Sequence, residues 1–277
     1  MDNNKKAIDV LICPVCKSDM YMSDDGRSAF CRGIKKHCFD FSSDGYLSFP
    51  QSSGGDSKAA VAARRNFLAR DYYLPAATAI CEIVKKYVPN NAILIDAGCG
   101  EGYYTSKLSD LADVTVGFDL SKFACAAAAK NAKREGKRGL FYSTASVFSL
   151  PVKDSVADAI VNIFAPCAEE EYSRILRDGG YLFVVGAGKE HLMGLKRAIY
   201  DETYENGERA DLPKKMTMVE RQTVHFEIEV DGKDDIAALF SMTPYYWRTS
   251  EGDKEKLMLL DRLKTEIKFE ISVYRKD

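Results

Sequence analysis

A glycine-rich turn that follows an apolar segment is the part of this chain best suited to bind a small molecule. The apolar segment runs over residues 92–96, and the turn reads Asp-Ala-Gly-Cys-Gly-Glu-Gly from Asp96 to Gly102. Glycine allows backbone conformations that other residues avoid, and it lets a ligand approach the main chain closely. Backbone N–H groups at the start of a following helix can bind a nucleotide-like ligand. A second apolar segment ends in Asp119, whose carboxylate can accept hydrogen bonds from both hydroxyls of a ribose.

The spacing of this turn favours S-adenosylmethionine (SAM) over a nicotinamide dinucleotide. The turn lacks the two-residue gap that precedes the last glycine of the dinucleotide fingerprint. Asp96 lies inside the turn, where its carboxylate can point to the amino acid end of SAM. The arrangement resembles motif I of class I methyltransferases. We therefore expect SAM to contact Asp96, Gly98, Gly100 and Asp119.

The first forty residues contain a second candidate site, for a metal ion. Cys13 and Cys16 form a CxxC pair, and Cys31 and the pair His37-Cys38 follow after a short segment. Thiolates and an imidazole at these spacings suit a tetrahedral zinc ion, with His37 or Cys38 as the fourth ligand. Residues 20–22 and 29–30 predict two short strands of a ribbon. Because all four positions are filled by protein, we expect a structural zinc that folds the segment.

Composition limits the remaining possibilities. The chain has 277 residues, 46% hydrophobic and 29% charged, which suits one large or two unequal soluble domains. The formal net charge of −2 argues against a nucleic-acid binder that uses its whole surface, but it allows a local basic patch. The chain has no apolar stretch long enough to span a membrane, and its start does not resemble a secretory signal. We expect a cytoplasmic protein that does not associate with membranes.

Strand and helix patterns alternate from residue 92 onward, which predicts an α/β fold. The expected strands are 92–96, 113–118, 139–144, 157–164 and 180–187, and the expected helices are 102–111, 121–135, 168–177 and 189–205. A turn at Asp178-Gly179-Gly180 is expected before the fifth strand. Strands over 216–230 and 264–274, around a helix near 234–241, predict an antiparallel pair at the sheet edge.

The resulting fold class is a class I methyltransferase, a Rossmann-like doubly wound sheet, with an N-terminal zinc-ribbon subdomain. Residues 1–50 are the expected zinc ribbon, which would recognise RNA. Residues 51–75 are a linker, polar up to residue 57, and a helix that carries Arg64 and Arg65. Residues 76–277 are the expected SAM-dependent methyltransferase domain.

Four motifs along the chain resemble those of one family, the 23S rRNA (guanine-N1)-methyltransferases. They are the CxxC…C…H ribbon, the stretch from Asp96 to Thr105, Ala165-Pro166-Cys167, and Met242-Thr-Pro244. The resemblance extends over nearly the whole chain. It implies methylation of a guanine N1 in a 23S rRNA hairpin, with SAM and structural zinc as cofactors, and a homodimer. An RNA-binding role for the ribbon and for Arg64 and Arg65 follows from the same expectation.

The resemblance also implies which residues bind these cofactors. The zinc ligands of the family fall on Cys13, Cys16, Cys31 and His37. Five residues separate Cys31 from His37 where the family usually has three, which keeps Cys38 as an alternative ligand. The SAM contacts of the family fall on Tyr73, Gly100, Glu101 and His191.

The catalytic residues stay unassigned at this point. Guanine N1 carries a proton that must leave before or as the methyl group arrives, and a carboxylate, a carbonyl or water could accept it. Asn162 and the carbonyl groups of Ala165 and Pro166 lie at the end of the predicted fourth strand, where they could hold the edge of a base.

Two other functions remain open from the sequence. A small-molecule methyltransferase, for example one acting on a quinone precursor, would explain the SAM motif but would give the ribbon no task. A non-catalytic RNA-binding scaffold would explain the ribbon, but the intact Gly98, Gly100, Gly102 and Asp119 argue against a decayed site.

Overall fold

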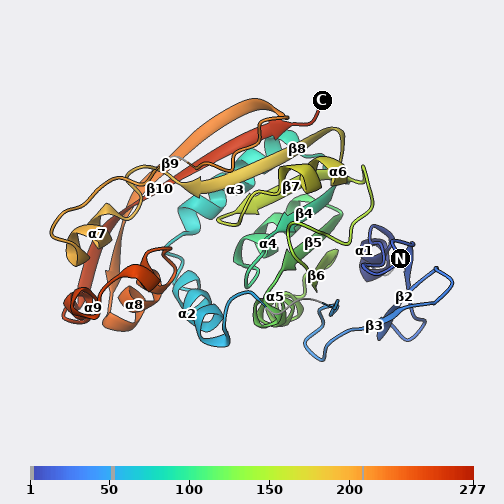
Figure 1. Ribbon diagram of the computed structural model, residues 1–277, viewed down its shortest axis with the longest axis horizontal. Coiled ribbons are helices and arrows are strands. Elements are labelled where there is room, and N and C mark those ends of the chain that lie inside the picture. The colour runs from blue at the N-terminus through green and yellow to red at the C-terminus, as the bar shows by residue number, and fades with distance from the viewer. Residues whose placement is uncertain (1–2, 51–53, 208) are drawn as a thin grey trace.

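A seven-stranded sheet forms the centre of the protein in the computed structural model, which describes residues 3–50, 54–207 and 209–277. The strand order is β6-β5-β4-β7-β8-β10-β9 (Figure 1). The five strands β6 to β8 run parallel, and β10 pairs antiparallel with both β8 and β9. The strand bounds are β4 Ile93–Ala97, β5 Val114–Asp119, β6 Leu140–Thr144, β7 Ala157–Ile163, β8 Leu176–Ala187, β9 Thr217–Asp231 and β10 Arg262–Arg275. The expected α/β sheet with an antiparallel pair at one edge is confirmed.

Both faces of the sheet are buried, which explains why its central strands are apolar throughout. Leu94, Val161 and Phe183 point to one face and pack with the helix α3, Leu74–Tyr87. Ile95 and Ile160 alternate to the other face and pack with α6, Glu169–Ile175. The helices α4, Tyr103–Leu108, and α5, Lys122–Arg134, follow β4 and β5 along the chain, as expected for a doubly wound sheet.

The N-terminal segment completes the second face of the sheet. It starts with α1, Asn3–Asp9, and continues into a three-stranded ribbon of β1 Met20–Met22, β2 Ser28–Cys31 and β3 Cys38–Asp40. The crossover from β6 to β7 forms no helix, and α1 contacts β5 and β6 instead. Leu47 is buried beside β6, where its N–H donates to the carbonyl oxygen of Tyr142 at 3.0 Å. The sheet therefore depends on residues before position 50 for its cover.

The strands β9 and β10 extend beyond the parallel strands and carry a group of helices on their far ends (Figure 1). These helices are α7 Met193–Ile199, α8 Lys233–Ser241 and α9 Glu251–Met258, and α2, Lys58–Leu68, packs against α8. Arg64 of α2 contacts Glu101, which follows β4, and His191, which precedes α7, contacts Phe164, which follows β7. The helix α2 and the start of α7 therefore lie at the carboxyl ends of these parallel strands. Within the described residues, no helix has the length and apolar character needed to cross a bilayer.

Several expected boundaries were wrong. The helix expected over 189–205 is limited to α7, because Asn206 folds back and donates its side-chain amide to the carbonyl oxygens of Gly188 and His191. The turn expected at 178–180 lies inside β8, where Gly179 adopts a φ of 76° and donates to the carbonyl oxygen of Lys276. The helix expected over 102–111 ends at Leu108 and continues as the 3-10 turn Ser109–Leu111. The linker residues 51–53 lie outside the described part of the chain.

Candidate cofactor site and metal centre

The glycine turn after β4 has the geometry of a ligand cradle. Gly98, Gly100 and Gly102 adopt φ values of 92°, 55° and 82°, which side chains disfavour. A Cβ atom on Gly98 would lie 2.4 Å from Cβ of Ala165, so the turn packs directly against the segment that follows β7. A Cβ atom on Gly100 would meet nothing closer than the Arg64 guanidinium at 3.6 Å. The main chain at Gly100 is thus the part of the turn that a ligand can approach.

Asp96 is a buried carboxylate with one unused oxygen. Its side chain is 1% exposed, and Oδ2 accepts a 2.6 Å hydrogen bond from the Thr105 hydroxyl. Oδ1 has no partner among the described residues. Burial raises the pKa of Asp96 to about 7, with a smaller effect from the nearby carboxylates of Asp119 and Glu101. An unpaired buried acceptor of this kind suits a cationic group of a bound ligand.

Asp119 is held at the end of β5 by the turn itself. Its Oδ2 accepts a hydrogen bond from the Gly100 N–H at 3.0 Å, and its Oδ1 accepts one from the Ser121 N–H at 2.7 Å. The side chain is partly exposed, and each carboxylate oxygen can accept a second hydrogen bond. The geometry therefore allows the expected contact with the two hydroxyls of a ribose.

Arg64 closes this region from α2, a role that the sequence did not indicate. Its Nε donates to Oε2 of Glu101 at 2.5 Å, and its NH1 donates to Oδ2 of Asp56 at 2.7 Å. The Glu101 side chain is 5% exposed, so this ion pair is largely shielded from water. Two carboxylates contact the Arg64 guanidinium in this structure, so an RNA phosphate would have to share it with them, and the expected contact of Arg64 with RNA stays a prediction. Arg65 is exposed and stays compatible with that role.

Tyr73 and His191 form a second group with Phe164 and Phe269, next to the glycine turn. Tyr73 is 4% exposed, and its ring packs edge-on against Phe269 at 5.3 Å. His191 lies 6.5 Å from Tyr73 and 6.1 Å from Phe164, measured between ring centroids. Phe164 directly precedes Ala165, which touches the glycine turn. The group around Tyr73 and His191 therefore lies next to the turn residues that are expected to bind SAM. The sequence did not single out Phe164 or Phe269.

His191 is held as a neutral hydrogen-bond donor. Its Nδ1 accepts a 3.2 Å hydrogen bond from the backbone N–H of Lys268, which assigns the ring proton to Nε2. Burial lowers the pKa of His191 to about 3. The imidazole is therefore uncharged near neutral pH, and its Nδ1 is already used as an acceptor.

The structure contradicts the expected contact between Asn162 and a substrate base. Asn162 is 0% exposed, and its Nδ2 donates to the carbonyl oxygen of Pro166 and to the Tyr172 hydroxyl, both at 3.0 Å. Its Oδ1 accepts a hydrogen bond from NH2 of Arg209, which also donates to the carbonyl oxygen of Ala165. Asn162 and Arg209 thus fix the backbone that follows β7, and the buried Asn162 side chain does not face a ligand.

We expect Asn162→Ala to lower the free energy of unfolding by about 1–3 kcal/mol, because it leaves buried partners unsatisfied. Urea denaturation of the purified protein would measure this change. Asn91→Ala is the matched control, because Asn91 is exposed in a turn. Equal stability of Asn162→Ala and the wild-type protein would contradict the role assigned to Asn162.

The expected metal ligands come together in the ribbon. The ligand atoms of Cys13, Cys16, Cys31 and His37 all lie within 4.8 Å of one another. The sulfurs of Cys13 and Cys31 are each 3.5 Å from Nδ1 of His37, and the sulfurs of Cys16 and Cys31 are 3.6 Å apart. A tetrahedral zinc ion with ordinary bond lengths requires separations of about 3.8 Å between sulfurs and about 3.5 Å between sulfur and nitrogen. The donor set and its spacing therefore fit zinc.

The surroundings of the four ligands support the same metal chemistry. Hydrogen bonding from the side chain and backbone of Ser18 lowers the pKa of Cys16 to about 6, which favours the thiolate that zinc binds. Cys38 lies outside the cluster, exposed, with its sulfur 3.8 Å from Asp40 Oδ1. The structure thus groups His37, and not Cys38, with the three cysteines.

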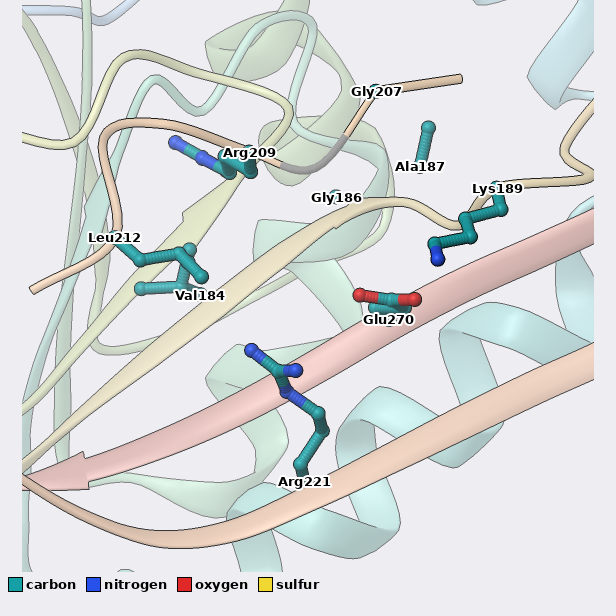
Figure 2. Close-up of a pocket in the computed structure, with 9 residues that line it drawn as sticks. All are labelled: Val184, Gly186, Ala187, Lys189, Gly207, Arg209, Leu212, Arg221 and Glu270. Atoms are coloured by element: carbon teal, nitrogen blue, oxygen red, sulfur yellow. The ribbon is translucent and has the colours of Figure 1, made fainter. Parts of the chain in front are cut away.

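A separate cavity of about 70 Å³ lies beside the end of β8. Figure 2 shows the Glu270 carboxylate between Arg221 and Lys189, whereas Arg209 points away from it. The cavity is much smaller than the several hundred Å³ typical of ligand pockets, and none of the predicted site residues lines it. This cavity is therefore separate from the candidate cofactor site at the glycine turn.

Comparisons with known proteins also indicate a methyltransferase. A family model described as Methyltransferase domain matches residues 95–184, which include the glycine turn and Asp119. A protein of Micromonospora griseorubida, assigned by name as a 23S rRNA (guanine-N(1)-)-methyltransferase, is 28% identical over 269 residues, covering 86% of this chain and 87% of that protein. The 23S rRNA (guanine(748)-N(1))-methyltransferase of Streptomyces fradiae is 30% identical over 203 residues, covering 70% of this chain and 69% of that protein.

A solved structure supports the fold independently of these relatives. The YcgJ protein of Bacillus subtilis is similar with a TM-score of 0.50 at 13% identity, over 73% of this chain and 98% of that one. At this identity the likeness concerns the fold alone. It agrees with the doubly wound sheet described above.

Proposed function

The chain belongs to the family of 23S rRNA (guanine-N1)-methyltransferases, and we propose that it methylates N1 of one guanine in a 23S rRNA hairpin. The coarser activity, SAM-dependent methyl transfer, follows from the methyltransferase domain. The observation that carries the finer proposal is the combination of a glycine cradle with a Cys/His cluster on one chain. A small-molecule methyltransferase would need the first feature but not the second.

In this proposal the carboxyl ends of β4 and β5 bind the cofactor. Asp119 accepts hydrogen bonds from the ribose, the main chain at Gly100 lies along the cofactor, and Asp96 Oδ1 faces its amino acid end. Glu101 acts through its ion pair with Arg64, which holds α2 over the turn. SAM supplies a methyl group on a sulfonium, a good leaving group, so the task of the protein is to place guanine N1 in line with that methyl.

The group around His191 contributes orientation, not proton removal. His191 is neutral with its proton on Nε2, so it can donate a hydrogen bond to a carboxylate or a carbonyl oxygen but cannot accept the N1 proton at Nδ1. Tyr73 presents an aromatic ring beside it, which can lie near the positive sulfonium. The N1 proton would leave to solvent water, and a backbone carbonyl near the end of β7 could accept a hydrogen bond from N1–H before that step.

The ribbon supplies a surface suited to an RNA backbone. Its two metal-binding loops, residues 13–18 and 31–38, carry the cations Lys17, Arg32, Lys35 and Lys36, and no carboxylate. All four are exposed, and none forms an ion pair with a described residue. Val15 and Ile34 are exposed on the same loops. Cations on a zinc-held frame bind phosphates with a strength that falls as salt rises.

The test is methyl transfer from labelled SAM to unmodified 23S rRNA, followed by primer extension. We expect incorporation at one guanine and a reverse-transcriptase stop there, because an N1 methyl group blocks base pairing. Unlabelled tRNA and a heat-denatured 23S rRNA transcript are the controls for substrate class and for hairpin structure. Measurable SAM binding without incorporation into any rRNA would contradict the proposal.

A further inference from the structure

Phe164 adopts a backbone conformation that aromatic residues avoid. Its φ is 53°, in the left-handed region, where a bulky side chain is a genuine outlier. Glycine or asparagine would take this conformation at lower cost. Such strain persists only where the surrounding structure enforces it, and it concentrates at functional sites.

The neighbouring contacts enforce this conformation. The N–H of Phe164 donates to the carbonyl oxygen of Val185 at 3.0 Å, which anchors its backbone to β8. On the other side, Ala165 packs against Gly98, and Arg209 donates to its carbonyl oxygen. Asn162 holds the carbonyl oxygen of Pro166. The chain is therefore folded tightly across the glycine turn, and the Phe164 side chain projects out of it.

The ring of Phe164 is supported on one side and open on the other. It stacks on His191 with the planes 29° apart, and it packs edge-on against Phe269 with centroids 4.8 Å apart. Yet 48% of Phe164 is exposed, whereas Tyr73 and Phe269 in the same group are buried. An aromatic ring that its neighbours hold in place, with part of its surface exposed, is suited to stack on a flat ligand.

We propose that Phe164 is the stacking platform for the guanine that is methylated. This inference rests on the proposed function, because a base in a hairpin must leave its own stack to reach the cofactor and gains a new stacking partner there. The adenine of SAM is a poorer candidate for this ring. Its ribose is expected at Asp119 on β5, and Phe164 follows β7, two strands away and therefore about 10 Å across the sheet.

The test compares Phe164→Tyr, Phe164→Leu and Phe164→Asn in methyl transfer to 23S rRNA and in SAM binding. Loss of a stacked base corresponds to about a 5- to 150-fold fall in kcat/KM for RNA. We expect that fall for the leucine and asparagine variants, and less than about a threefold change for tyrosine, which keeps the ring. The dissociation constant of SAM should stay unchanged in all three.

Thermal unfolding separates this role from a structural one. Asparagine tolerates the left-handed backbone, so Phe164→Asn should unfold at the same or a higher temperature than the wild-type protein while losing RNA activity. A hairpin with 2-aminopurine at the mapped guanine should fluoresce less when bound to the wild-type protein than when bound to Phe164→Asn, because the Phe164 ring restacks the displaced base.

The outcomes distinguish this inference from the proposed function. Wild-type kcat/KM in Phe164→Asn, or a weaker affinity for SAM in that variant, overturns the platform and leaves rRNA methylation standing. A wild-type protein that binds SAM but methylates no rRNA overturns the proposed function and the platform together.

Discussion

Cys31→Ala should lose both its zinc and its methylation of 23S rRNA while it keeps its affinity for SAM. Cys31 is buried, its sulfur lies 3.6 Å from that of Cys16, and it accepts a hydrogen bond from the His37 N–H at 3.1 Å. A structural zinc site contributes on the order of 10 kcal/mol to the folding of a small domain, so the loops should unfold without it. We expect zinc to fall from about one equivalent to below about a tenth, and RNA methylation to fall by about 100-fold or more.

The control for this prediction is Cys38→Ser. Cys38 belongs to the same ribbon but lies outside the ligand cluster, so its replacement should leave zinc content and methylation unchanged. Metal content by mass spectrometry, SAM binding by calorimetry and the rRNA assay are the three measurements. Zinc retained in Cys31→Ala, or lost in Cys38→Ser, would contradict the ligand set. Equal methylation with and without zinc would contradict the role of the ribbon in RNA binding.

Substitution is a sharper test of the ribbon than deletion of residues 1–50. Ala7, Ile8 and Leu11 are fully buried against the sheet, and Phe49 is 5% exposed. Deleting them would uncover the face of β5 and β6 and destabilise the cofactor domain itself. A change at Cys31 affects the metal-binding loops and leaves these contacts in place.

The order of strands and helices could be predicted because it depends on local patterns. Each parallel strand is a short apolar stretch bounded by turn residues, and β4 to β8 lie within a few residues of the expected ranges. Motifs formed by neighbouring residues were predictable for the same reason. Asp96, Gly98 and Gly100 share one turn, and Cys13 and Cys16 share one loop.

Contacts between distant segments could not be predicted in this way. Arg64 meets Glu101, which is 37 positions away, only because α2 packs beside the turn. Asn162 is held by Arg209, which lies in an irregular segment without a sequence pattern. The exposed position of Phe164 follows from the same contacts, because Asn162 and Arg209 hold the backbone that follows β7. The error over Asn162 has the same origin, since the sequence places it near the site but does not show which way its side chain turns.

The ionisation of Asp96 should make SAM binding depend on pH. Burial raises the pKa of Asp96 to about 7 in the free protein, so the carboxyl group is largely protonated at pH 6. A ligand with a sulfonium and an ammonium group favours the ionised carboxylate. Binding below pH 7 must therefore release a proton, and the affinity for SAM should rise as pH increases toward 7. The raised pKa of Asp96 has the opposite effect on the stability of the SAM-free protein. The contribution of this carboxyl group to the free energy of unfolding falls as pH rises from about 4 to about 7.

We expect the dissociation constant of SAM to fall by up to about tenfold per pH unit between pH 5.5 and 7, below the range in which the amine of SAM titrates. Asp96→Asn should bind SAM about 10- to 100-fold more weakly at pH 7.5, because the amide lacks the charge, and should show no such slope. Calorimetry in two buffers of different ionisation enthalpy would count the proton released. Asp110→Asn is the control, since Asp110 is an exposed carboxylate paired with Lys137. A wild-type affinity that stays constant from pH 5.5 to 7 would show that the unused oxygen of Asp96 does not face the positive end of the cofactor.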